Sequence, residues 1–466
     1  MLVLISDIHL TDNGFSKTIP AQAFRIFRER LRDMAYDASW RADGTYRPIE
    51  ELDLILLGDI LDVIRSERWP SSEEGDADYV RPWSGADDAR FRSKVREIVE
   101  AILERNEPAL EVLRSFNSPE VMTLPPATAD GKVARVSREP DSPERVPFRV
   151  RIHYLAGNHD WFVHLPGAAF EQMRRLIVER MGLAQPPEQP FPYQPEDSAA
   201  LEEICRRHQA YFRHGDYYDV FNFHGDRKLS SIGDAIVIDL LNRFCATVER
   251  QLGQELPAEC LAGLRQIDHV RPLLLAPVWV DSLLQRTCTD RKLAQEVKRI
   301  WDAVADRFLN LPFVRECAEY LPALTLDKLA IALKFSKGVS LHLLGQLFSW
   351  VSEKLPCANE RPTAQDAMSE PAFKNRRART IVYGHTHDQQ LVPLRVAPDT
   401  AGLFQQTYVN TGTWRVLNQR VPFQGDPPEF VSHWVMTYVG LYQGDERGGR
   451  SFETWSGTLA LPAGRP

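Results

Sequence analysis

Short apolar runs that end in polar residues recur along the chain, at MLVLI (1–5), LDLILLGD (52–59), VRIHYLAGNHD (150–160), RTIVYGHTH (379–387) and QTYVNTGTW (406–414). Runs of this length that are rich in Val, Ile, Leu and Tyr and close with Gly, Asn, Asp or His are typical of β-strands. The most continuous of them are typical of strands buried on both faces of a sheet. The pattern therefore predicts a strand at each of these places.

Apolar residues with helical spacing lie between the predicted strands. Residues 21–35 and 167–182 predict helices, and charged helical pieces around 87–115 belong to a longer segment, 65–149, that interrupts the strand pattern. Pro, Ser, Thr and Asp crowd residues 117–147, which predicts a loop excursion. We therefore interpret 65–149 as an insertion.

Residues 233–373 have a different pattern from the rest of the chain. Their apolar residues follow helical spacing at 233–252, 291–309 and 325–355, with almost no strand signal, and a Pro-containing polar stretch at 356–373 predicts a flexible return. We interpret this region as a helical insertion or cap. The remaining core is then made of residues 1–64, 150–232 and 374–466.

Composition places the chain among ordinary globular proteins, with 466 residues, of which 43% are hydrophobic and 26% charged. The formal charge of −8 weighs against a dedicated nucleic-acid wrapper, although bound metal ions would still allow a nuclease. The 6 cysteines are scattered, with no CxxC pair, which favours reduced thiols. The chain shows no signal peptide and no apolar run of about 18 residues, so we expect a cytoplasmic protein without a transmembrane segment.

One apolar stretch, VSLHLLGQLFSWV at 339–351, has two interpretations. Its neighbours have similar helical patterns, which favours a core helix of the insertion. The alternative is a helix that docks on a membrane surface, which would suit a lipid-linked substrate. Peripheral membrane association is therefore the alternative to a purely cytoplasmic location.

Acidic, amide and imidazole side chains stand at the ends of the predicted strands: Asp7, His9, Asp59, Asp62, Asn158, His159, His385 and His387, with His214 or His224 from two HGD turns. Any one of them alone is an ordinary turn residue. In open α/β sheets, however, ligands bind at the carboxyl ends of the strands. Because the arrangement recurs from strand to strand, we expect these side chains to meet at one site.

Carboxylates and imidazoles without thiolates favour divalent ions such as Mn, Fe, Zn, Co or Ni. The set is too large for one ion and suits two ions roughly 3.5–4 Å apart that share one carboxylate and a bridging hydroxide. Such a dinuclear metal centre clamps an anionic oxyacid and lowers the pKa of bound water. We expect two divalent metal ions, with Mn2+ (manganese) favoured, and hydrolysis of a phosphate ester.

The ordered motifs DIH, GDILD, GNHD, HGD and GHTH resemble the signature of the calcineurin-like metallophosphoesterase superfamily. The resemblance covers roughly residues 1–64, 150–232 and 376–415 and says little about the two insertions. It implies an α/β (α+β) fold in which two mixed β-sheets pack as a sandwich flanked by helices. It also implies a metal-binding hydrolase, either a phosphatase or a phosphodiesterase.

The resemblance further implies a role for each residue. The metal ligands would be Asp7, His9 and His387 for the first ion, Asn158, His385 and an HGD histidine for the second, and Asp59 for both. HGDYYDVFN matches the family turn better than FNFHGD does, so His214 is favoured over His224. His159 would protonate the leaving oxygen, oriented by Asp62, since imidazole has the right pKa range and a carboxylate fixes its tautomer. Asn158 would also touch the phosphoryl group.

The two histidines of GHTH are two residues apart. In a strand, residues i and i+2 point the same way. His385 and His387 are therefore expected to face one site, and each to reach a different ion.

Three functions are compatible with these motifs. GNHDWFVHLPG and HGDYYDVFN resemble the branch with the UDP-diacylglucosamine pyrophosphatases, which favours a phosphorylated small-molecule or lipid-linked substrate. The alternative is an Mre-type nuclease, against which the acidic balance and the lack of a basic or aromatic DNA-binding module weigh. A non-catalytic scaffold of the same fold is less favoured, because every expected ligand is present.

Overall fold

The computed structural model describes residues 1–12, 18–72, 75–271, 275–320, 364–399, 402–421 and 429–460. The predicted helical stretch 325–355, including 339–351, lies outside the described residues, as do residues 356–363 of the predicted return at 356–373. Among the described residues, no helix is both long enough and apolar enough to cross a membrane.

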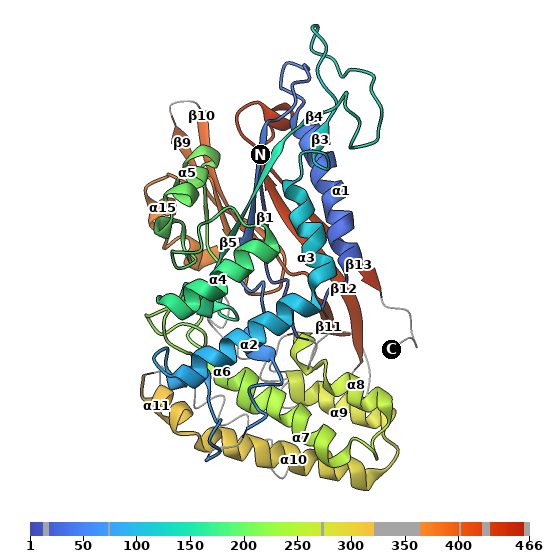
Figure 1. Cartoon of the computed structure of the whole chain (residues 1–466), viewed down its shortest axis with the longest axis vertical. Helices are drawn as coiled ribbons and strands as arrows, with labels where there is room; N and C mark the ends of the chain where they lie inside the picture. The colour runs from blue at the N-terminus through green and yellow to red at the C-terminus, as the bar shows by residue number, and fades with distance from the viewer. Residues whose placement is uncertain are drawn as a thin grey trace.

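Two β-sheets form the centre of the molecule (Figure 1). The larger has the order β5-β2-β1-β12-β11-β7, with β13 paired to β12, and the smaller has the order β6-β8-β10-β9. The strands of the larger sheet are β1 (Leu2–Ile5), β2 (Glu51–Leu57), β5 (Arg149–Leu155), β7 (Val270–Arg271), β11 (Val416–Arg420), β12 (Phe430–Leu441) and β13 (Phe452–Ala460). Those of the smaller sheet are β6 (Ala210–Phe212), β8 (Thr380–Tyr383), β9 (Gln390–Asp399) and β10 (Gly402–Asn410).

Alternation along β1 shows how the layers pack. Leu2 and Leu4 lie in a buried cluster with Phe212 and Val382 of the smaller sheet, so this cluster fills the space between the sheets. The intervening residues Val3 and Ile5 belong to a second cluster, shared with the covering helices. Successive strand side chains point to opposite faces, and β1 is apolar on both. The predicted α/β sandwich is confirmed.

Helices cover the outer face of the larger sheet (Figure 1): α1 (Ala21–Ala38), α2 (Ala89–Arg105), α3 (Glu107–Arg114) and α4 (Ala168–Met181). Helix α5 (Ala199–His208) leads into β6, and the short helices α14 (Ala364–Ala367) and α15 (Pro371–Lys374) precede β8. Helices α2 and α3 fall in segment 65–149, yet Phe91 and Leu110 pack in the same cluster as α1 and α4. A short antiparallel pair, β3 (Thr123–Leu124) and β4 (Val146–Pro147), closes the expected loop excursion.

The described part of segment 233–373 is largely helical and has its own buried cluster. Its helices, in the lower part of Figure 1, are α6 (Ile232–Ala235), a π-helical turn (Ile236–Asn242), α7 (Arg243–Leu252), α8 (Ala258–Leu264), α9 (Ala276–Thr287), α10 (Arg291–Asn310) and α11 (Pro312–Tyr320). The helical spacing did not predict β7, which pairs in parallel with β11. This two-residue strand joins the insertion to the edge of the larger sheet.

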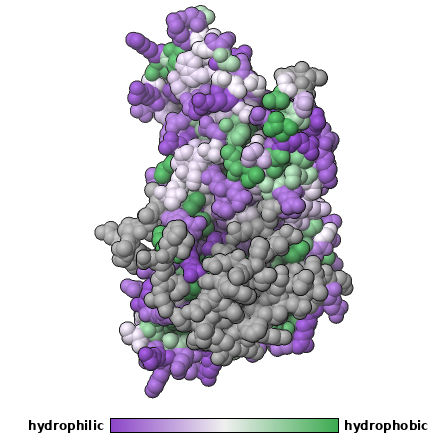
Figure 2. All heavy atoms as spheres, turned by 180° about the vertical axis from the view of Figure 1, so that it is seen from behind, coloured by the Kyte–Doolittle hydropathy of each residue, from purple (hydrophilic) through white to green (hydrophobic). Residues whose placement is uncertain are grey.

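Part of the solvent-exposed surface of the smaller sheet is apolar. Leu391, Val396 and Leu403 of the β9–β10 hairpin are exposed, and Figure 2 shows apolar surface over this hairpin. The buried side of the same sheet faces the sandwich interior through Val382 and Val409.

Candidate metal centre

The carboxyl ends of parallel strands in both sheets face one region. In the larger sheet β1, β2 and β5 run parallel, and in the smaller sheet β6, β8 and β10 do. The predicted residues follow these strands directly: Asp7 and His9 after β1, Asp59 and Asp62 after β2, Asn158 and His159 after β5, His214 after β6, and His385 and His387 after β8. The sandwich therefore gathers them from five strand ends.

Backbone conformation at this site is unusual. Asp7, His9, Asp59, His385 and His387 all have positive φ, between 51° and 70°, and they are most of the non-glycine residues with positive φ in the described chain. This region costs a non-glycine residue about 1–3 kcal/mol and is concentrated at functional sites. The two GHTH histidines thus lie in left-handed turns beyond β8, and their shared direction does not come from strand alternation.

Gly58 and Gly157 allow the loops after β2 and β5 to lie in close contact with each other and with His214. A Cβ on Gly58, whose φ is +83°, would overlap the ring of His214, and a Cβ on Gly157 would overlap the carboxylate of Asp59. Any larger residue would push the loops after β2 and β5 apart.

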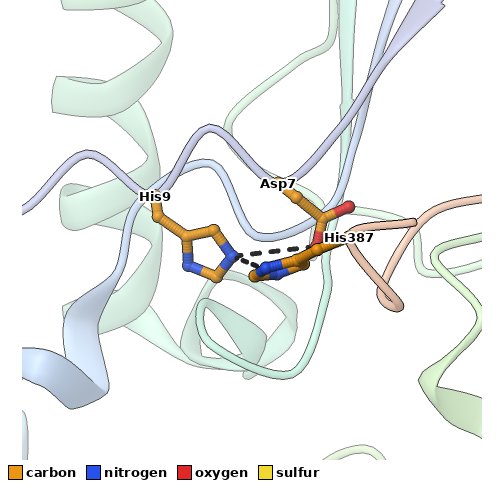
Figure 3. A group of neighbouring side chains, drawn as sticks. All are labelled: Asp7, His9 and His387. Carbon is orange, nitrogen blue, oxygen red and sulfur yellow. Dashed lines mark hydrogen bonds and ion pairs between the residues drawn. The ribbon is translucent and has the colours of Figure 1, made fainter. Parts of the chain in front are cut away.

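The first group of donor atoms consists of Asp7, His9 and His387 (Figure 3). Nε2 of His9 lies 3.0 Å from Nε2 of His387 and 3.7 Å from Oδ1 of Asp7. Nε2 of His387 lies 3.2 Å from the same Asp7 oxygen. Within the described chain, this buried Asp7 oxygen accepts no hydrogen bond. A buried anionic oxygen facing two imidazole nitrogens suits a cation between them.

The second group consists of Asp59, His214 and His385. Nδ1 of His214 donates to the carbonyl of Leu57 at 2.9 Å, so Nε2 is the ring atom that faces the site. That Nε2 faces two further acceptors, Oδ2 of Asp59 and Oδ1 of Asn158, each at 3.2 Å. Burial lowers the pKa of His214, but the carboxylates of Asp59 and Asp7 outweigh burial and raise it well above its ordinary value, so a proton is favoured on this nitrogen. A metal ion can take the place of that proton, and these buried His and Asp groups can bind one.

Asp59 connects the two groups. Its Oδ2 lies 3.8 Å from Nε2 of His9 and 4.0 Å from Nε2 of His159, and its Oδ1 accepts the backbone N–H of His159 at 2.8 Å. A further donor group contains His9, Asp59 and His159. Asp59 therefore lies between the two groups.

The buried carboxylates are ionised despite their burial. For Asp7, burial opposes ionisation, but the imidazoles of His214 and His387 outweigh it and hold the pKa well below its ordinary value. The pKa of Asp59 is lowered against burial by His214 and His159 in the same way, and that of Asp62 by His159 and His9. Concentrated negative charge of this kind attracts divalent cations.

Asp62 orients two imidazoles at once. Its Oδ2 accepts from Nδ1 of His9 at 2.8 Å and its Oδ1 from Nδ1 of His159 at 2.6 Å. Both rings therefore turn Nε2 toward the site. Burial lowers the pKa of His159, but the carboxylates of Asp62 and Asp59 outweigh burial, and the net shift is upward. The net shift favours the protonated form of the ring.

Two residues of this site were not predicted from the sequence. Oδ2 of Asp219 lies 2.9 Å from Nε2 of His385 and accepts the side-chain amide of Asn222 at 2.7 Å. Asn222 in turn accepts the amide of Asn158 at 3.2 Å, which points the Asn158 oxygen toward His214. Only the nearby HGD motif could have pointed to Asp219, five residues after His214. His224, the alternative ligand, is exposed, whereas His214 lies in the second group.

A scan against protein-family models found no match to this chain, and a search of curated proteins found none either. The chemistry of the site has to be inferred from its residues.

Proposed function

We propose that this protein is a metal-dependent phosphoesterase, as its resemblance to the calcineurin-like metallophosphoesterases implies. The observation that carries the proposal is the pair of buried donor groups linked by Asp59, with the His159–Asp62 pair directly beside them. Two adjacent cation sites next to a proton donor are what hydrolysis of a phosphate ester requires. The substrate class proposed is a phosphorylated small molecule or a lipid-linked phosphate.

The residues that would hold the ions are Asp7, His9 and His387 for one, Asn158, His214 and His385 for the other, and Asp59 for both. These are oxygen and imidazole ligands without thiolates, which suit Mn2+, with Fe, Zn, Co or Ni as alternatives. When bound, such ions polarise phosphoryl oxygens and lower the pKa of bound water.

His159 supplies the general acid in this proposal. Asp62 holds its Nδ1 proton, so Nε2 is the atom that gives a proton to the leaving oxygen. Burial lowers the pKa of His159, but Asp62 and Asp59 raise it overall, which favours that proton. Asn158, which Asn222 orients, places its amide where it can contact the phosphoryl group.

Hydrolysis assays with Mn2+ test the proposal directly. The panel is p-nitrophenyl phosphate, bis-p-nitrophenyl phosphate, a UDP-sugar and single-stranded DNA, each with an EDTA control. We expect EDTA-sensitive cleavage of a phosphate ester. His159→Ala should reduce kcat about 10²–10⁴-fold while the protein stays folded, and Asp59→Ala should abolish turnover together with metal binding.

His433 on β12 lies outside the donor groups and offers a matched control, His433→Ala, with normal turnover expected. Wild-type turnover by the His159 variant would refute the proposed acid. Cleavage of DNA alone would instead favour a nuclease.

A further inference from the structure

Three arginines gather beside the candidate metal centre, each from a different part of the chain. Arg65 ends the short 3-10 helix that follows Asp62, and Arg415 follows the loop after β10. Arg271 belongs to β7, the strand that the helical insertion adds to the larger sheet. Arg65 and Arg415 both pair with the carboxylate of Asp268, Arg415 at 3.0 Å. The insertion thus supplies both Arg271 and the acid that positions the other two.

This arginine group is fixed to the metal centre by short contacts. The hydroxyl of Thr413 and the backbone N–H of Trp414 both donate to the carbonyl of Asp7, at 2.8 and 3.1 Å, immediately before Arg415. On the other side, Arg271 pairs in register with Gln419 of β11. Nη2 of Arg271 lies 2.7 Å from Nδ1 of His387. Rigid strands therefore hold a guanidinium against a candidate metal ligand.

Metal binding changes what Arg271 can contact. Arginine only donates, so Nδ1 of His387 is the acceptor of the 2.7 Å contact and the proton of the neutral ring sits on Nε2. A ring that gives Nε2 to a metal ion carries its proton on Nδ1 instead, and two donors cannot face each other. If His387 held a metal ion through Nε2, Nη2 of Arg271 would need a different acceptor. A phosphoryl oxygen bound beside His387 is an acceptor of the right charge.

Burial shows that this positive charge is held away from water. Arg65 and Arg415 are 1% and 4% exposed, whereas Arg271 is half-buried and reaches the surface. Burial first, then the neighbouring Arg415, lower the pKa of Arg65 to about 9, so it stays charged near neutral pH. The carboxylate of Asp268 compensates one of these charges, so the arginine group keeps a net positive charge that attracts an anion.

We propose that Arg271, supported by Arg65 and Arg415, forms an oxyanion site that binds the scissile phosphoryl group of the substrate and selects a dianionic phosphomonoester over a monoanionic diester. That the bound group belongs to a substrate rests on the proposed phosphoesterase function. Oxyanion binding itself can be measured without turnover. The planar fork of arginine matches two phosphoryl oxygens, and a second negative charge on the ligand strengthens the attraction.

Binding of inorganic phosphate to the Mn2+-loaded protein is the first test, measured by calorimetry at pH 8, where phosphate is a dianion. We expect Arg271→Gln to raise the Kd at least about tenfold, and Arg271→Lys to raise it less. Arg250→Gln, on an exposed position of α7 in the same insertion, should leave the Kd unchanged. Metal content is measured in parallel. If Arg271→Gln loses Mn2+, the comparison is made with Arg271→Lys, which keeps the charge.

Relative turnover of two esters is the second test. Arg271→Gln should lower kcat/KM for p-nitrophenyl phosphate about 10–100-fold, mainly through KM, and for bis-p-nitrophenyl phosphate by less than about threefold. An equal loss for both esters, or an unchanged phosphate Kd in a metal-loaded variant, overturns the oxyanion site. Phosphate binding that depends on Arg271, without cleavage of any of the four substrates in the hydrolysis panel, would support the oxyanion site and refute the phosphoesterase function.

Discussion

At the scale of single residues, the motifs predicted which side chains meet and that Asp62 orients His159, but not that Asp219 contacts His385. Asp7, His9, Asp59 and the GHTH histidines could be predicted because each follows an apolar run directly. Asp219 could not, since one acidic residue in HGDYYDVFN carries no spacing signal and its contact with His385 exists only after β6 and β8 pair. Asp219 comes close to His385 only in the folded chain, so the sequence alone does not identify it as a partner of a metal ligand.

Asp219 should therefore set metal affinity rather than catalytic chemistry. Its carboxylate holds Nε2 of His385 at 2.9 Å, and loss of such a partner typically weakens metal binding about 10–100-fold. We expect Asp219→Asn to need correspondingly more Mn2+ for half-maximal activity, with kcat restored when Mn2+ is saturating. Asp226→Asn, an exposed turn residue nearby, is the control and should match the wild type. A lower kcat at saturating Mn2+ would instead give Asp219 a part in the reaction.

The pH profile should depend on Asp62. A general acid works while protonated, so the rate falls as pH rises through the pKa of His159. Burial alone would lower that pKa, and the Asp62 carboxylate is the largest of the contributions that raise it. Asp62→Asn should therefore move the alkaline limb of kcat/KM to lower pH. Rates are measured from pH 5 to 10 with metal content monitored, because Asp62 also orients His9. An unmoved limb in the metal-loaded variant would exclude His159 as the acid.

At the scale of elements, local patterns and long-range pairing differ in how well they can be predicted. Helices α1 and α4 and strands β1, β2 and β5 match their predicted segments closely, because periodicity is a local property. β7 was not predicted, because it has only two residues and lies in a region with a helical pattern. These residues form a strand only through their pairing with β11. The same applies to segment 65–149, whose helices join the main core through contacts far apart in sequence.

A buried ion pair joins that segment to the insertion. Arg81 and Asp239 are fully buried, and Nε of Arg81 lies 2.9 Å from Oδ2 of Asp239 in the π-helical turn. Arg81 also donates to the carbonyls of Trp69, Val80 and Ser72. Arg81→Ala removes one of the two arginines that pair with Asp239 and leaves Arg243 at 2.8 Å. It also takes the donor away from three backbone carbonyls, so it should lower the free energy of unfolding by at least about 1–3 kcal/mol.

Urea denaturation measures this change, and Arg90→Ala is its matched control. Arg90 also pairs with an aspartate, Asp88, but is exposed, and surface pairs contribute about 1 kcal/mol or less. Similar losses in the two variants would show that burial of the Arg81–Asp239 pair does not matter for stability.

At the scale of the whole molecule, the sandwich brings together strand ends from both sheets, so the candidate centre joins them. The family resemblance predicted this arrangement from five short motifs. The contacts of the insertion with the larger sheet and with His387, made through β7, followed from the structure. Asp7 of the larger sheet accepts the backbone N–H of His385 from the smaller one at 2.9 Å. Metal ions bound between these loops would add links between the sheets that the unfolded chain lacks.

Metal removal should therefore lower thermal stability. An ion at 100 times its Kd stabilises the folded state by about 2.7 kcal/mol, which for two sites in a chain of this length corresponds to roughly 3–6 °C in Tm. We expect EDTA to lower the Tm of the Mn2+-loaded protein by this amount in differential scanning fluorimetry. Asp59→Asn should abolish the shift, because the substitution removes the charge that lies between the two donor groups while its amide oxygen can still accept from His159. Asp226→Asn should retain the shift. A full EDTA shift in the Asp59 variant would place the stabilising metal somewhere other than between the two sheets.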